Sequence, residues 1–183
     1  MKLHLGCWHR FIPGFIHIDL CEMDHIDFNS SIEDLSMFED ASVSLIYSSH
    51  SFEYFNRNKA LKVLKEWYRV LEVGGTLRLA VPDFDSLLNI YQQTGEIDNI
   101  LGPLYGQMSI QTPSGQEILY HKTVYNFQSL TKLLVKCGFN NVERYEWQAT
   151  IHKDYDDHSQ AYFPHMDKKN GILVSLNIEA RKI

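Results

Sequence analysis

The sequence predicts an α/β protein in which a largely parallel sheet carries helices on both faces. Short apolar runs alternate along the chain with segments of helical periodicity, which is the pattern of a doubly wound sheet. Glycine or proline bounds most of these runs, as it does at the ends of strands. No helix separates the last two predicted strands, so they are expected to pair as a hairpin, with the final strand antiparallel.

The expected elements follow in order along the chain. Strands are predicted at 2–5, 15–20, 25–29, 42–49, 76–82, 140–150 and 172–182, and helices at 58–71, 85–93 and 127–138. Gly74 and Gly75 are expected to end the long helix with a left-handed cap, and Asp83 to cap the helix that follows it. Only nine residues, 6–14, separate the first two strands, so this crossover must be a short stub in place of a helix.

We expect a single domain over residues 1–183, because 44% hydrophobic residues are enough to fill one core. Two irregular segments, 94–126 and 152–171, are expected to cover one end of the sheet and to shape a pocket. The net charge of −6 argues against a nucleic-acid partner. No apolar run matches a signal peptide or a membrane span, so a soluble cytoplasmic protein with no membrane partner is expected.

Cysteine and histidine spacing predicts neither disulfides nor a metal site. The three cysteines contain no CxxC pair, which favours reduced thiols. His152, His158 and His165 share a polar stretch with three aspartates, but they lack the tight spacing of a helix-borne site. We therefore predict no bound metal.

Four stretches of the chain resemble the class I S-adenosylmethionine-dependent methyltransferases. They are KLHLGCWHRFIPGFIHIDL (2–20), FEDASVSLIYSSHSFEYF (38–55), LKEWYRVLEVGGTLRLAVPDFD (64–85) and HKTVYNFQSLTKLLVKCGFNNVERY (121–145). The resemblance implies a Rossmann-like sheet of seven strands, S-adenosylmethionine as cofactor and a small-molecule methyl acceptor. It is nearest to small methyltransferases with a shortened first crossover, often met beside sugar-polymer genes, which suggests a sugar or polysaccharide-precursor hydroxyl as acceptor.

The resemblance places the cofactor first against Gly6, Cys7 and Asp19. Glycine after a strand allows a sharp turn and a close approach of the backbone to the methionine part of the cofactor. The family usually has Gly-x-Gly, whereas Trp8 stands here in place of the second glycine. Asp19 closes the second strand, where a carboxylate can accept both ribose hydroxyls. A plain turn glycine and a solvated strand-end carboxylate remain the structural alternatives for Gly6 and Asp19.

Further along the chain, Ser31 and Ile32 align with residues that contact adenine in the family, and Ser48 and Ser49 extend the cofactor site. His50 follows them at the end of a strand. An imidazole, with an ordinary pKa of ~6.5, suits the removal of a hydroxyl proton, so His50 is the catalytic candidate. A hydrogen-bonded wall histidine is the alternative.

The acceptor side is expected to include Tyr54, His121 and Tyr125, and Glu53 is expected to orient His50. Two other functions stay open. One is a catalytically silent binding module whose cofactor site Trp8 blocks. The other is a nicotinamide-dependent reductase, which the missing GxGxxG fingerprint disfavours.

Overall fold

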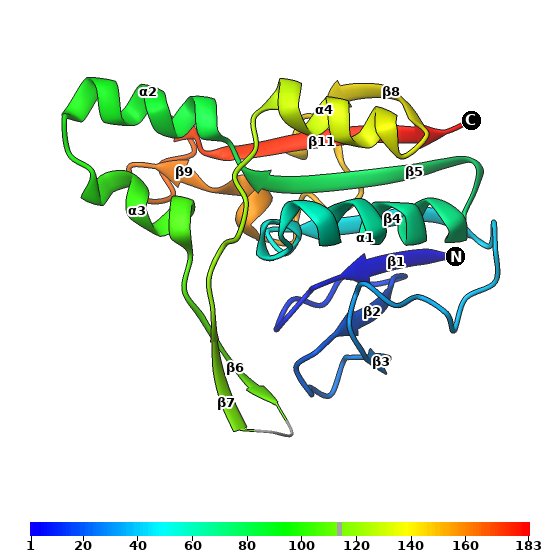
Figure 1. Cartoon of the computed structure of the whole chain (residues 1–183). Coiled ribbons are helices and arrows are strands. Elements are labelled where there is room, and N and C mark those ends of the chain that lie inside the picture. The colour runs from blue at the N-terminus through cyan, green and yellow to red at the C-terminus, as the bar shows by residue number, and fades with distance from the viewer. Residues whose placement is uncertain (113–114) are drawn as a thin grey trace.

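A computed structural model describes residues 1–112 and 115–183, and its centre is one mixed sheet of seven strands (Figure 1). The strand order is β3-β2-β1-β4-β5-β11-β8. The bounds are Lys2–Leu5 (β1), Ile16–Asp19 (β2), Phe28–Asn29 (β3), Val43–Ser49 (β4), Leu71–Pro82 (β5), Phe139–Arg144 (β8) and Ser175–Lys182 (β11). The pairs from β3 to β5 are parallel, while β11 is antiparallel to both β5 and β8. The predicted mostly parallel sheet with an antiparallel last strand is confirmed.

The helices and small hairpins fill the connections. The α-helices are Arg57–Val70 (α1), Phe84–Thr94 (α2), Asp98–Tyr105 (α3) and Phe127–Lys136 (α4), and the 3-10 turns are Phe52–Tyr54, Trp147–Ala149 and His158–Gln160. The two hairpins are Met108–Thr112 with Gly115–Leu119 (β6, β7) and Tyr162–Phe163 with Ile172–Leu173 (β9, β10). Asp83 caps α2 as predicted, since its side chain accepts from the Asp85 N–H at 3.2 Å. No helix in the described ranges could cross a membrane.

One face of the sheet packs against α1 and α4. Trp67 and Leu64 of α1 and Leu130 of α4 are fully buried in the main core with the apolar side chains of the strands. The indole N–H of Trp67 also donates to the Ile32 carbonyl at 2.7 Å. This bond ties α1 to the loop after β3. The helix thus positions the chain that approaches the ligand edge, the edge at the carboxyl ends of the parallel strands where open α/β sheets bind ligands.

The opposite face has mainly irregular cover, because no α-helix connects β1 to β2 or β2 to β3. Ile12 and Phe15 from the first crossover pack on Leu45 and Tyr47 of β4. The His152 ring, from the segment between β8 and β9, stacks on Tyr47 with ring centroids 3.9 Å apart. The stub predicted from the nine-residue spacing is thus the whole connection between two paired parallel strands.

The expected end of the long helix at Gly74 and Gly75 is wrong. Helix α1 ends at Val70, and Leu71 is already extended, although its N–H still bonds to the Trp67 carbonyl. Both glycines lie within β5, and Gly74 has a φ of +83°. They lie in the stretch where the β4–β5 register shifts, so glycine serves a strand irregularity and not a helix cap.

The segment 94–126 has more regular structure than its sequence indicates. It contains α3 and the β6–β7 hairpin, which projects from the body of the molecule past the ends of β1 and β2 (Figure 1). Three hairpin side chains, Met108, Ile110 and Leu119, line a cavity at that edge. The hairpin therefore brings apolar residues to the ligand edge of the sheet.

Candidate cofactor and acceptor site

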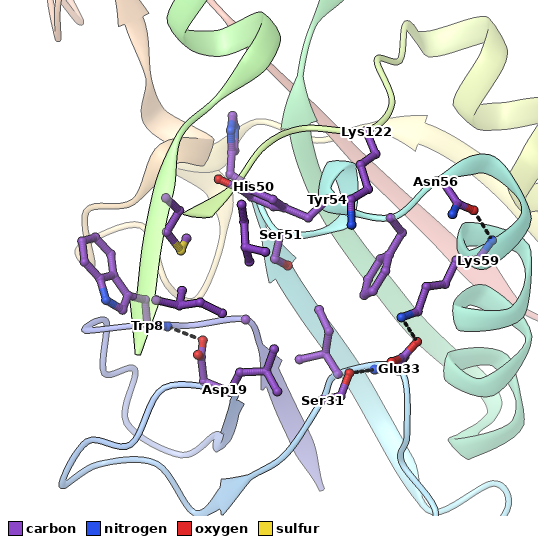
Figure 2. A pocket seen from close by; sticks show the side chains of 17 residues that line it. Trp8, Asp19, Ser31, Glu33, His50, Ser51, Tyr54, Asn56, Lys59 and Lys122 are labelled. Atoms are coloured by element: carbon purple, nitrogen blue, oxygen red, sulfur yellow. Dashed lines mark hydrogen bonds and ion pairs between the residues drawn. The ribbon is translucent and has the colours of Figure 1, made fainter. Parts of the chain in front are cut away.

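Two adjoining cavities lie at the carboxyl ends of the central parallel strands. The first, of about 230 Å³, is shown in Figure 2. Its wall includes Gly6, Trp8, Asp19, Ser31, Ile32, His50, Ser51, Tyr54 and Lys59. The second, of about 530 Å³, is lined among others by Arg10, Ser49, Gln107, Ser109, His121 and His158. Gly6, Trp8, His50, Tyr54 and Met108 line both cavities, so these five residues mark where the two meet.

The turn after β1 needs glycine for two reasons. Gly6 has a φ of +67°, a left-handed conformation that other residues adopt at a cost. A Cβ at this position would also lie 2.5 Å from Ser51 Cβ. The Gly6 N–H donates to the Ile18 carbonyl at 2.9 Å. The glycine therefore lets the turn after β1 pass close to Ser51, which follows β4, while its own N–H continues the pairing of β1 with β2.

Trp8 has a left-handed backbone conformation, which favours glycine. Its φ is +46°, so both ends of the Gly6-Cys7-Trp8 turn are left-handed. Its N–H donates to Asp19 Oδ2 at 2.7 Å, and its indole is 38% exposed at the cavity wall (Figure 2). Both ends of this turn thus have the conformation that favours glycine, and an aromatic ring stands beside the first cavity.

Asp19 is a buried carboxylate with acceptor capacity to spare. It accepts the Trp8 N–H on Oδ2 and the Cys21 N–H on Oδ1, at 2.8 Å, and is 8% exposed. A carboxylate oxygen has two acceptor positions, so one remains on each oxygen. Because Asp19 lines the first cavity, it can receive two hydroxyl donors from a ligand there.

The far end of the first cavity contains the two residues expected near adenine, Ser31 and Ile32. Beside them Lys59 Nζ pairs with Glu33 Oε2 at 2.7 Å (Figure 2). This ion pair connects α1 to the loop after β3, so it closes that end of the cavity. Lys59 was not among the residues expected at the site, because its position relative to the apolar stripe of α1 fits an exposed side chain.

His50 lies at the junction of the two cavities. It has a φ of +51°, and its side chain is 12% exposed. Its Nε2 is 2.9 Å from Ser175 Oγ and its Nδ1 is 3.5 Å from Glu53 Oε1, so the side chain of Glu53 lies next to the ring. Burial, with His158, His121 and Arg10 nearby, holds the pKa of His50 well below its usual value. The ring is therefore neutral at physiological pH, and one of its two nitrogens carries a lone pair.

The structure brings most of the expected residues to the cavities and leaves three outside them. Cys7 is buried, and burial with the nearby Asp19 raises the pKa of its thiol to about 12. Ser48 is fully buried and its Oγ is 2.5 Å from Ser51 Oγ. Tyr125 is buried and stacked on Phe52. None of the three side chains lines either cavity. The sequence places Cys7 and Ser48 at strand ends and Tyr125 before a helix, but it does not show which way their side chains point.

The second irregular segment, 152–171, contributes His158 and Ala161 to the larger cavity. Its other two histidines lie elsewhere, since His152 is fully buried and His165 is exposed. Among the described residues no group of three or more histidine, cysteine, aspartate or glutamate side chains could hold a metal ion.

Known proteins share this architecture and part of the sequence. Residues 18–79 match the methyltransferase domain family. This chain has the fold of a class I S-adenosylmethionine-dependent methyltransferase. S-adenosylmethionine is the cofactor of that family. No curated protein sequence matches the chain.

Solved methyltransferases match the chain over nearly its whole length. A SAM-dependent methyltransferase from Methanosarcina mazei is 17% identical with a TM-score of 0.56, covering 100% of this chain and 92% of that one. A SAM-dependent methyltransferase from Archaeoglobus fulgidus is 15% identical with a TM-score of 0.55, covering 99% of this chain and 85% of that one. The 1,6-didemethyltoxoflavin-N1-methyltransferase of Burkholderia thailandensis, solved with S-adenosylhomocysteine, is 13% identical with a TM-score of 0.54, covering 99% and 70%.

Proposed function

We propose that this methyltransferase-fold protein transfers a methyl group from S-adenosylmethionine to a hydroxyl of a small molecule, such as a sugar or a polysaccharide precursor. The observation that carries the proposal is the junction of the two cavities at Gly6, Trp8, His50, Tyr54 and Met108. A methyl transfer needs two ligands whose reacting atoms meet in line. Two adjoining cavities with a neutral imidazole between them meet that need.

The first cavity is proposed as the cofactor site. Asp19 takes the ribose hydroxyls on its two remaining acceptor positions, and Ser31 and Ile32 contact the adenine. Because Gly6 has no Cβ, the turn passes close to Ser51 without a steric clash. When bound, S-adenosylmethionine supplies a methyl carbon activated by a sulfonium.

The larger cavity is proposed as the acceptor site. Its lining comes from the first turn, α3, the β6–β7 hairpin and the segment around His158. A cavity of about 530 Å³ fits a small acceptor. Tyr54 and His121 orient it, and His50 removes the hydroxyl proton. Free cysteines agree with the cytoplasmic location that belongs to this proposal.

Calorimetry with S-adenosylhomocysteine, followed by transfer of labelled methyl from S-adenosylmethionine to a panel of sugars and nucleotide sugars, tests the proposal. We expect saturable binding and label in at least one hydroxyl compound. His50→Ala should keep the binding and lose the transfer. Absence of any binding heat would instead favour the silent module, in which the Trp8 indole obstructs the first cavity.

A further inference from the structure

Glu53 is a fully buried carboxyl group without a hydrogen bond. It lies in the 3-10 turn after β4, is 0% exposed, and neither of its side-chain oxygens has a hydrogen-bond partner. Two imidazoles flank one of these oxygens, because Oε1 lies 3.5 Å from His50 Nδ1 and 3.6 Å from His121 Nε2. Leaving an ionised carboxylate buried and unpaired is costly, so the protonation of this cluster needs an explanation.

A chain of hydrogen bonds fixes which nitrogen of His50 carries the proton. The Asn177 amide donates from Nδ2 to the Ser159 carbonyl at 2.8 Å, which leaves Oδ1 as its acceptor. The Ser175 hydroxyl donates its only proton to that Oδ1 at 2.9 Å. Ser175 Oγ must therefore accept from His50, so Nε2 carries the hydrogen. In the neutral ring, Nδ1 then carries a lone pair and no hydrogen, and it faces Glu53.

His121 presents a bare nitrogen to the same oxygen. Its Nδ1 is 3.0 Å from the Pro103 carbonyl, and a carbonyl can only accept, so Nδ1 carries the hydrogen. Burial is the main cause that lowers the pKa of His121, which keeps the ring neutral. Its Nε2 lone pair therefore faces Glu53 Oε1 from the other side.

Two lone pairs and an ionised carboxylate would repel one another in this buried space. We propose that His50, Glu53 and His121 share one mobile proton, which rests on Glu53 Oε1 and can move to either ring. Glu53 is thus a neutral carboxylic acid in the resting protein. It acts as a positioning residue that fixes the orientation of His50 and adjusts the charge beside it.

The surroundings support a neutral resting cluster. Burial raises the pKa of Glu53 to about 8. The other titratable groups near the cluster are His158 and Arg10 on the His50 side, and Tyr54 and Tyr125 on the Glu53 side. Both tyrosines are neutral at physiological pH, since burial raises their pKa values to about 12. The positive charge of Arg10 opposes a second proton on His50.

The shared proton allows the positive charge that forms on the proposed base, His50, to be balanced by an ionised Glu53. This proton transfer rests on the proposed function. With the Glu53 proton turned toward His121, His50 Nδ1 is free to accept from an acceptor hydroxyl. The acceptor O–H bond breaks and an N–H bond forms on His50. Glu53 then passes its own proton to His121 Nε2, and the resulting carboxylate lies between two imidazolium rings. The cluster gains one proton and one positive charge in total.

Side-chain NMR of the full chain, without cofactor or acceptor, tests the shared proton independently of methyl transfer. We expect the Glu53 carboxyl carbon to titrate near pH 8, with the Nδ1 of His50 and the Nε2 of His121 responding in the same transition. The nitrogen shifts of both rings should show one fixed neutral tautomer each at pH 7. Ser175→Ala should turn the His50 pattern into a tautomer mixture.

Glu53→Gln supplies the matched test, since glutamine keeps the shape but cannot titrate. Both rings should lose the transition near pH 8, whereas Glu39→Gln, an exposed carboxyl outside both cavities, should leave it intact. A wild-type Glu53 carbon that is already ionised at pH 6, or rings that show no transition near pH 8, would overturn the shared proton. That result needs no variant to fold and leaves the methyl-transfer proposal standing.

Discussion

The backbone N–H of Trp8 donates to Asp19 Oδ2 at 2.7 Å, and so joins the turn after β1 to the end of β2. A helix makes this connection in most doubly wound sheets, but here a nine-residue stub makes it, and this hydrogen bond adds to the pairing of β1 with β2. Because the donor is a main-chain group, the bond does not depend on the indole. The large side chain at this position therefore leaves the bond to Asp19 in place.

The tight turn at Gly6 predicts a large loss of stability for Gly6→Ala. The left-handed φ costs about 1–2 kcal/mol for a residue with a Cβ, and the contact 2.5 Å from Ser51 Cβ adds overpacking of about 1–3 kcal/mol. Gly74→Ala is the control, since Gly74 has a φ of +83° with nothing near its Cβ position. Urea unfolding should show the smaller loss for Gly74→Ala, and equal losses would contradict the close approach.

The left-handed Trp8 predicts an unusual order of two substitutions. Trp8→Gly and Trp8→Ala both remove the indole, but only glycine adopts a φ of +46° without strain. The glycine variant should be more stable than the alanine variant by about 1 kcal/mol. The free energies of unfolding of the two variants measure this difference directly. An alanine variant of equal or greater stability would show that the turn is not left-handed at this residue.

The acceptor positions of Asp19 predict its effect on the cofactor. Asp19→Asn replaces one carboxylate oxygen with a donor, so one backbone N–H and one ligand hydroxyl lose their partner. We expect S-adenosylhomocysteine to bind about 10- to 100-fold more weakly, from a loss of roughly 1–3 kcal/mol. Calorimetry measures the change, with Asp24→Asn at an exposed position as control. Unchanged affinity in a folded Asp19→Asn protein would place the ribose elsewhere.

Buried histidines predict a loss of stability in acid. Burial lowers the pKa of His152 to about 4, so the folded chain keeps this ring neutral while the unfolded chain protonates it below ~6.5. Between these two values the unfolded state binds more protons, and stability falls as pH falls, by at most about 1.4 kcal/mol per pH unit. The fall of the unfolding midpoint between pH 7 and pH 4 should become less steep in His152→Gln. It should stay unchanged in His165→Gln, whose side chain is exposed.

Periodicity and spacing predicted the main strands but not all their bounds, since the strand expected at 140–150 ends at Arg144 and a 3-10 turn follows at Trp147–Ala149. Apolar runs such as 42–49 and 76–82 predict β4 and β5, and the nine residues between the first strands predict the stub. The hairpin β6–β7 escaped prediction because its strands are only five residues long and β7 is largely exposed. The helix end at Gly74 was misplaced because glycine also serves strand irregularities, and only pairing with β4 decides between the two.

The candidate site, like the sheet, could be predicted only in part from the sequence. The sequence by itself indicated a mostly parallel sheet with an antiparallel last strand, and the residues that follow or close its strands, including Gly6, Asp19 and His50, because these depend on local pattern. Only the tertiary structure decided that Cys7 and Tyr125 face away from the cavities, and that His121 meets Glu53 across a separation of 68 residues along the chain. Side-chain direction and long-range contact follow from how the strands and covering segments pack, and no local pattern records that packing.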